Sequence, residues 1–115
     1  TYFGREPVVA DPGGYVAPPL EGVWATAPYF HNGSVPTLAD VLKSTERPKA
    51  WHRTPDGYDT ARVGLEAERL EAVPPAIARD FRARRLYFDT SLDGKSAAGH
   101  TFGDKLSDEE RKALV

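Results

Sequence analysis

The chain contains neither cysteine nor methionine among its 115 residues. Without cysteine it can form no disulfide bond, no thiolate metal site and no catalytic thiol. It also lacks a signal peptide and any apolar run near the roughly 18 to 20 residues that a membrane span needs. We therefore expect no membrane span within these residues.

An excess of charge of one sign is also absent. Fifteen Lys and Arg residues stand against 17 Asp and Glu, which gives a formal net charge of -2. Proteins that bind nucleic acid or an acidic membrane surface usually show a strong basic excess. We predict that nucleic acid is not a partner.

Glycine and proline, by contrast, are plentiful. Ten of each, in a chain with 28% charged residues, predict one loop-rich domain with a modest core. The most informative stretch is 15–42. Three prolines make the backbone of its first part stiff and mostly non-helical: Pro18, Pro19 and Pro28. The tight turn expected at Asn32-Gly33 then presents His31.

Capping patterns predict two helix starts. Thr37 with Asp40 has the form of a capping box and opens a helix from Thr37 to about Ser44, while Ser107 with Glu110 opens a final helix that we expect to be truncated at Val115. The other expected elements are a helical turn over 20–25, a long loop over 45–61, a strand or a helix over 64–73 and a basic helix over 76–86. The basic helix is either a solvated face or a contact for an acidic partner.

The segment GVWATAPYFHNGSVPTLADVL, residues 22–42, resembles a known family motif. It is similar to the TAPYxHDGSxxTL segment in the C-terminal haem domain of di-haem cytochrome c peroxidases, and more closely to WATAPYLHNGSVPTL in rubber-oxygenase-like di-haem cytochromes. Four further segments occur in the same order in that family: ERPKAW at 46–51, GYD at 57–59, YFDTS at 87–91 and GKSAAGHTFGDKLSDEERKALV at 94–115.

The resemblance implies a mainly α fold with long irregular loops, in an incomplete cytochrome c-like haem domain. Residues 1–14 would be a lead-in loop and 15–115 the C-terminal part of that domain. The cofactor would be haem c, attached outside this segment because the CxxCH motif is absent. The partners implied are the remainder of the same cytochrome and a redox partner protein, in the periplasm. The parent would be a peroxidase- or oxygenase-like oxidoreductase, and this segment alone would not be catalytic.

His100 is the metal ligand that the resemblance implies. It falls on the GHxxG loop that supplies the distal axial histidine in the rubber-oxygenase-like proteins, and Gly99 lets the ring approach a flat cofactor. The peroxidase branch uses a methionine at the position of Thr45. Since this chain has no methionine, we expect an electron-transferring haem with histidine on both faces.

Further residues are predicted to contact the cofactor. His31 would hydrogen-bond near the haem, with direct iron ligation as the alternative, and His52 matches no ligand motif. Aromatic and polar neighbours complete the predicted haem contacts: Trp24, Tyr29, Asn32 and Phe102. Three cations are either propionate partners or solvated charges: Arg47, Lys49 and Arg53.

Two other functions stay open from the sequence. The aromatic and proline residues of 15–42 would also suit a haem-free module that binds a peptide or polymer strand. An EF-hand-like calcium loop over 89–104 is a weaker alternative, because the D-x-D-x-D-G spacing is missing.

Overall fold

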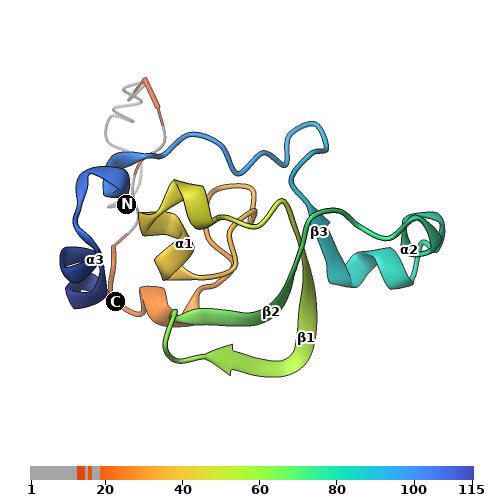
Figure 1. The fold of residues 1–115 in the computed structure, drawn as a ribbon, viewed down its shortest axis with the longest axis horizontal. Helices are drawn as coiled ribbons and strands as arrows, with labels where there is room; N and C mark the ends of the chain where they lie inside the picture. Colours follow the sequence, from red (N-terminus) through yellow and green to blue (C-terminus); the bar gives the residue numbers. More distant parts are fainter. Residues whose placement is uncertain (1–12, 15, 17–18) are drawn as a thin grey trace, which may run out of the picture.

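The computed structural model describes residues 13–14, 16 and 19–115. The predicted lead-in loop over 1–14 therefore lies almost wholly outside the described residues, as does Pro18. The described chain forms three short α-helices and a three-stranded antiparallel sheet of order β2-β1-β3 (Figure 1). The expectation of a mainly α fold is wrong, since the sheet occupies the middle of the chain.

The central strand β1 (Ala50–Asp59) replaces most of the long loop predicted over 45–61. It pairs along its length with β2 (Gly64–Leu70) and, through its first three residues only, with β3 (Tyr87–Asp89). The register shifts between Arg53 and Tyr58, where Pro55 and Gly57 lie. Such an irregularity accommodates residues that suggest a loop when they are read locally.

Of the two structures predicted for 64–73, a strand or a helix, the chain forms the strand, β2. The even alternation of Leu, Glu and Ala suits this strand. Leu65 and Ala67 are partly buried, whereas Glu66 and Glu68 are exposed. A period of two residues places alternate side chains on opposite faces of a sheet.

The helix α1 (Leu38–Leu42) begins as the sequence predicted, although it is shorter. The Thr37 hydroxyl accepts the Asp40 backbone N–H at 3.3 Å and donates to the Asp40 carboxylate at 2.6 Å. A 3-10 turn, η2 (Ser44–Glu46), follows directly. In Figure 1 α1 lies above the β1–β2 hairpin, with the loop between β3 and the next helical turn along its other side.

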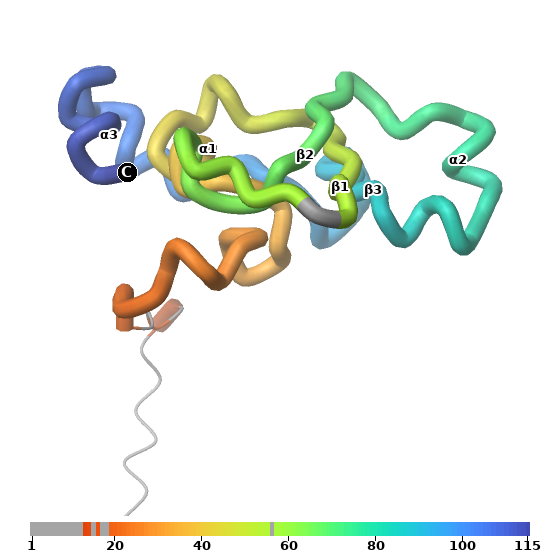
Figure 2. The backbone as a smooth tube through the Cα atoms, turned by 90° about the horizontal axis from the view of Figure 1, so that it is seen from below, coloured from red at the N-terminus to blue at the C-terminus, as the bar shows by residue number. Residues whose placement is uncertain are grey.

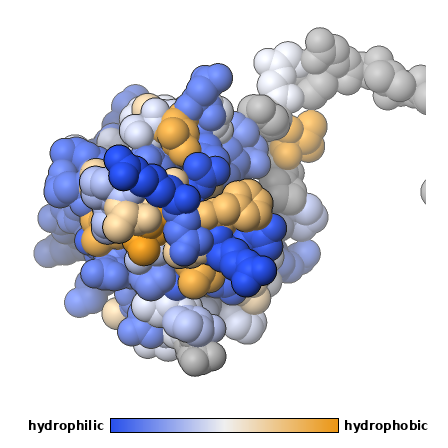
Figure 3. All heavy atoms as spheres, turned by 90° about the vertical axis from the view of Figure 1, so that its right-hand side faces the viewer, coloured by the Kyte–Doolittle hydropathy of each residue, from blue (hydrophilic) through white to orange (hydrophobic). Residues whose placement is uncertain are grey.

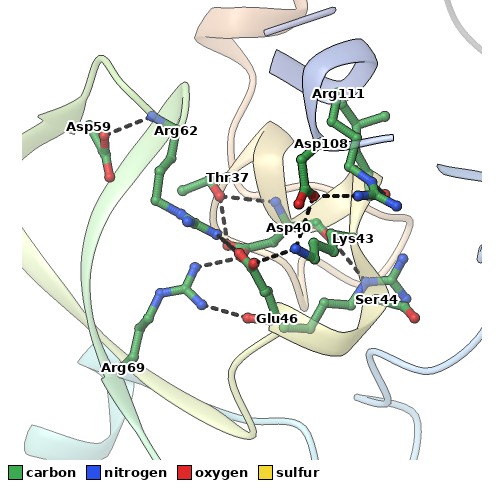
Figure 4. Close-up of polar contacts among 12 residues, drawn as sticks. Thr37, Asp40, Lys43, Ser44, Glu46, Asp59, Arg62, Arg69, Asp108 and Arg111 are labelled. Carbon is green, nitrogen blue, oxygen red and sulfur yellow. Dashed lines mark hydrogen bonds and ion pairs between the residues drawn. The ribbon is translucent and has the colours of Figure 1, made fainter. Parts of the chain in front are cut away.

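The carboxylate of Asp40 is fully buried and connects α1 to the sheet region (Figure 4). Its Oδ1 accepts hydrogen bonds from Arg62 at 2.7 Å and from Arg69 at 2.5 Å. Breaking a buried ion pair by removing one partner typically costs about 3–5 kcal/mol, because the other charge is left without compensation. This network therefore fixes α1 against β2 and the β1–β2 turn.

The hydrophobic core of the described residues is small and is formed by the segment before α1 and the start of β1. Its buried members are Tyr29, Val35, Ala50 and Trp51. Trp51 stacks on Phe88 of β3 with ring centroids 5.3 Å apart, and its indole N–H donates to the Ser34 carbonyl at 3.0 Å. Trp51 thus ties β1 to both β3 and the segment that follows His31.

The predicted basic helix over 76–86 is interrupted. The helix α2 (Pro75–Arg79) stops at Asp80, whose carboxylate accepts the backbone N–H groups of Arg82 and Ala83, and η3 (Ala83–Leu86) follows. A short polar side chain that competes for backbone donors ends a helix in this way. Figure 3 views this end of the molecule, where hydrophilic side chains surround scattered apolar ones. The exposed residues there include four arginines and Phe81: Arg79, Arg82, Arg84 and Arg85.

The C-terminal segment packs against α1 from the side away from α2. It consists of η4 (Phe102–Lys105) and α3 (Asp108–Leu114), and α3 opens with the complete Ser107–Glu110 capping box that the sequence predicted. Figure 2 shows α3 and α2 at opposite ends of the molecule, with residues 19–30 along one side.

Candidate histidine site

A tight turn presents His31. The Gly33 N–H donates to the Phe30 carbonyl at 3.1 Å, so His31 and Asn32 occupy the two central positions. Phe30 itself has φ 67°, a left-handed conformation that is unusual for a bulky residue. The turn predicted at Asn32-Gly33 is confirmed, and His31 is exposed on it.

Asn32 joins this turn to the loop that carries His100. Its side-chain amide donates to the carbonyls of Ser96 at 2.8 Å and of Gly94 at 3.3 Å, while its carbonyl oxygen accepts the Ser34 N–H at 3.1 Å. Both amide hydrogens and the amide oxygen are therefore used. Asn32 acts as a structural link between two segments more than 60 residues apart in sequence.

The two predicted histidines lie side by side. The ring centroids of His31 and His100 are 6.0 Å apart in an edge-to-face arrangement, and both residues are exposed. The Phe30 ring lies 4.7 Å from the His100 ring and supports it. His100 has φ 45° and follows Gly99 at φ 81°, so two consecutive left-handed residues raise the ring out of the loop.

The loop before His100 leaves open space around its backbone. A Cβ built on Gly99 meets no atom within 4 Å. A groove of about 430 Å³ borders this loop and is lined by side chains of the 96–101 and 44–49 segments. His100 thus stands on an open, small-residue loop, as an axial ligand that approaches a flat cofactor would require.

Arg47 lies directly behind the histidine loop. Its guanidinium is 4.8 Å from the centroid of the Phe30 ring and donates to backbone carbonyls on both α1 and the loop. Burial lowers the pKa of the Arg47 side chain from its ordinary value, against the opposing effect of Asp104 and Asp40. An arginine nevertheless keeps its positive charge at any pH at which the protein is folded.

Three other predicted residues belong to different surroundings. Tyr29 is buried, and its hydroxyl donates to the Val23 carbonyl at 3.0 Å. Its burial raises the pKa of the Tyr29 hydroxyl, and the nearby Tyr58 raises it further. Trp24 is 60% exposed and meets Tyr58 edge-to-face at 6.5 Å. Phe102, in η4, is 85% exposed. The structure thus brings together His31, Asn32 and His100, with Tyr29 and Trp24 in a second cluster.

His52 has a packing role in the sheet. It lies opposite Glu68 on β2 and Tyr87 on β3, and its ring stacks on Tyr87 at 4.3 Å. Its Nδ1 is 3.4 Å from a Glu68 carboxylate oxygen. This placement agrees with the absence of a ligand motif around His52 in the sequence.

Among the described residues, no group of three His, Cys, Asp or Glu side chains is arranged to hold a bare metal ion. This finding gives no support to a calcium loop over 89–104, where the Asp89 carboxylate accepts hydrogen bonds from Ser91. His31 and His100 are the two imidazoles that lie together on this face of the described residues.

Comparison with known proteins relates part of the chain to cytochromes. Residues 14–52 match the family described as RoxA-like, cytochrome c-like. This segment includes Trp24, Tyr29, His31 and Asn32, so it links that part of the chain to haem-related cytochromes. The di-haem peroxidase context expected from the sequence is not established by the match.

Two curated relatives come from Sinorhizobium fredii. The chain is 41% identical over 87 residues to uncharacterized protein y4iM, a match that covers 76% of this chain and 19% of that protein. It is 35% identical over 121 aligned positions to uncharacterized protein y4iJ, covering 96% of this chain and 18% of that protein. The chain thus spans about one fifth of the length of the curated relatives it matches.

None of the helices formed by the described residues has the length and hydropathy of a bilayer-crossing segment.

Sequence reasoning missed two residues of this site. Phe30 is not among the haem contacts predicted from the sequence, and Arg47 is predicted only as a propionate partner or a solvated charge. The contacts of Phe30 with His100 and of Arg47 with the loop join segments 70 and about 50 residues apart, which no local pattern shows. One local signal could have indicated the role of Arg47. It is a cation that follows the end of a helix without a glycine cap, and such a side chain can donate to the last carbonyls of the helix.

Proposed function

We propose that this chain forms the distal wall of a haem c site in an electron-transferring bacterial cytochrome, and that His100 is the distal axial ligand of the haem iron. The observation that carries the proposal is the exposed His31–His100 pair on a chain whose 14–52 segment matches a cytochrome c-like family. The parent protein would be a periplasmic oxidoreductase with a redox partner protein.

The residues present fit this group. His100 would hold the iron, His31 and Phe30 would contact the macrocycle or its substituents, and covalent attachment would come from the remainder of the same cytochrome, since the chain has no cysteine. Haem iron supplies one-electron transfer, and a second imidazole closes it to exogenous ligands and lowers its potential relative to methionine. The protein's own task is to hold the His100 imidazole in place.

The alternative of a haem-free module that binds a peptide or polymer strand receives less support. That function needs the aromatic residues of 15–42 to form a continuous exposed surface. Tyr29 is instead buried, with its hydroxyl bonded to Val23.

The test is the absorption and electron paramagnetic resonance spectrum of the full-length protein and three histidine variants. We expect a c-type pyridine haemochrome in the parent and, in His100→Ala, near-complete loss of low-spin haem together with new carbon monoxide binding. His52→Ala is the matched control, because it removes an imidazole from the sheet and should leave the spectrum unchanged.

Two outcomes would contradict the proposal. Loss of the low-spin signal in His31→Ala, with His100→Ala unchanged, would make His31 the ligand. A full-length protein without haem would overturn the cytochrome function altogether.

A further inference from the structure

The Arg47 side chain uses every N–H of its guanidinium on backbone carbonyls. Nε donates to Asp40 O at 2.9 Å, and one Nη2 bond goes to Val41 O at 3.1 Å. The other three bonds go to the histidine loop: Nη1 to Ala97 O and to Gly99 O, each at 2.7 Å, and Nη2 to His100 O at 3.0 Å. Five donors therefore meet five acceptors, which is the full capacity of an arginine.

On one side these bonds complete the end of α1. A helix of five residues leaves its last carbonyls without helical partners, and such groups need another donor when they are part-buried. Arg47 supplies two of the donors, and Arg111 takes the next carbonyl, that of Leu42, at 3.2 Å. The buried Asp40 network holds α1 to the sheet, so Arg47 is anchored to a helix that is itself fixed by ion pairs.

On the other side the same guanidinium determines the course of the loop. Residues 96–101 form no helix or strand, and Gly99 and His100 are both left-handed. Arg47 binds the Gly99 and His100 carbonyls, which flank the His100 Cα, and packs on the Phe30 ring, which in turn contacts the His100 ring. Both the backbone and the aromatic support of His100 therefore depend on one side chain.

We propose that Arg47 is the positioning residue of His100 and sets the direction in which its imidazole faces the haem. This inference rests on the proposed function. The sequence suggested a propionate partner for Arg47, but its five donors are already occupied, so a propionate would have to displace loop carbonyls. Groups that orient a metal ligand affect metal affinity or activity by about 10- to 100-fold when they are removed.

Lysine cannot replace arginine in this role. Its ammonium is a point charge with three donors, whereas the planar fork of arginine spans two segments at once. A comparison of Arg47→Lys with Arg47→Met thus separates the effect of positive charge from the effect of geometry.

The experiment uses the full-length protein with Arg47→Met, Arg47→Lys, His100→Ala and the control Arg69→Met. Arg69 is matched to Arg47 because it also contacts Asp40 and a backbone carbonyl, that of Glu46, but it makes these contacts from β2. Three quantities are measured: the low-spin fraction by electron paramagnetic resonance, the rate of carbon monoxide binding to reduced haem, and hydrogen exchange of residues 94–101.

In Arg47→Met we expect a mixed-spin haem, carbon monoxide binding about 10- to 100-fold faster than in the parent, and faster exchange in the loop. Arg47→Lys should resemble Arg47→Met in all three quantities. If Arg47→Met does not accumulate as folded protein, the same three measurements on Arg47→Lys test the inference. Arg69→Met should lower stability while leaving spin state and loop exchange unchanged.

The outcomes separate this inference from the proposed function. If His100→Ala loses the low-spin signal while Arg47→Met keeps the signal and the loop protection, Arg47 is not the positioning residue. A fully rescuing Arg47→Lys would show that charge alone suffices and would also overturn the inference. If His100→Ala leaves the spectrum unchanged, the haem assignment fails, and with it any role of Arg47 toward the iron.

Discussion

Gly103 is the residue at which the C-terminal segment comes closest to α1. It is buried, and a Cβ built on it would lie 2.4 Å from the Leu42 carbonyl oxygen and 2.7 Å from the Leu42 Cα. Both are backbone atoms, so no flexible side chain can move aside. The Gly103 carbonyl also accepts a hydrogen bond from Arg111, which fixes its position.

We predict that Gly103→Ala destabilises the protein by about 1–3 kcal/mol, the usual cost of an added carbon in a packed site. Chemical denaturation measures the effect. Gly14→Ala is the control, because its Cβ would meet no atom within 4 Å. Equal stability of the two variants would show that the contact between Gly103 and α1 is not formed.

The contacts of η4 and α3 with the two residues that follow α1, Lys43 and Ser44, depend on carboxylates. Asp104 accepts the Ser44 hydroxyl at 2.5 Å and the Ser44 backbone N–H at 2.7 Å, and these bonds, with smaller effects of Arg47 and Arg111, lower the pKa of Asp104 from its ordinary value of 3.8. The Asp108 carboxylate accepts a hydrogen bond from the Lys43 ammonium at 3.1 Å, and this bond is the main cause of the lowered pKa of Asp108 (Figure 4). The charged form of each aspartate is thus favoured in the folded state.

A carboxyl whose pKa is lower in the folded than in the unfolded protein stabilises the fold above its unfolded pKa, and this contribution is lost as the pH falls through the folded value. We predict that Asp104→Asn lowers the urea midpoint at pH 6 and that the difference from the parent shrinks as the pH falls below 3.8, the ordinary pKa of the carboxyl. Asp93→Asn, an exposed aspartate of the loop after β3, is the control. A difference that persisted in acid would mean that the Asp104 carboxylate does not provide this stability.

At this scale the sequence predicted the elements that depend on neighbouring residues. The starts of α1 and α3 follow from Thr37 and from Ser107 with Glu110, because a capping contact spans only three residues. The strand β1 was missed, because Pro55 and Gly57 indicate a loop when only local signals are read. Its strand geometry is stabilised by pairing with β2 and β3 and by burial of Trp51.

The histidine site shows the same limit. The Asn32-Gly33 turn drew attention to His31, and Gly99 together with the family resemblance drew attention to His100. That His31 and His100 lie 6.0 Å apart, with Phe30 and Arg47 behind them, depends on contacts across more than 50 residues. Whether either histidine binds iron stays a prediction.

The described molecule exposes much of its apolar surface. Only four hydrophobic residues are buried, whereas several large ones are mainly exposed: Val16, Leu20, Trp24, Phe81, Phe102 and Leu114. Apolar surface of this kind is typical of sites that contact another protein segment or a ligand. In the proposed function that surface would be covered by the haem and by the remainder of the same cytochrome.

We predict that the 115-residue chain alone binds more of the apolar dye anilinonaphthalene sulfonate, per mole, than the full-length protein does. Phe102→Ser should lower dye fluorescence of the isolated chain, because Phe102 is 85% exposed, while Thr101→Ser should not. Equal dye binding by the chain and the full-length protein would indicate that these side chains stay exposed in the parent.

The short helix α1 has a practical consequence for engineering. Arg47 and Arg111 together bind the carbonyls of three consecutive residues at its end, from Asp40 to Leu42. The number of residues between Leu42 and Arg47 therefore cannot change freely. One residue inserted there would move the Arg47 guanidinium away from its carbonyl acceptors.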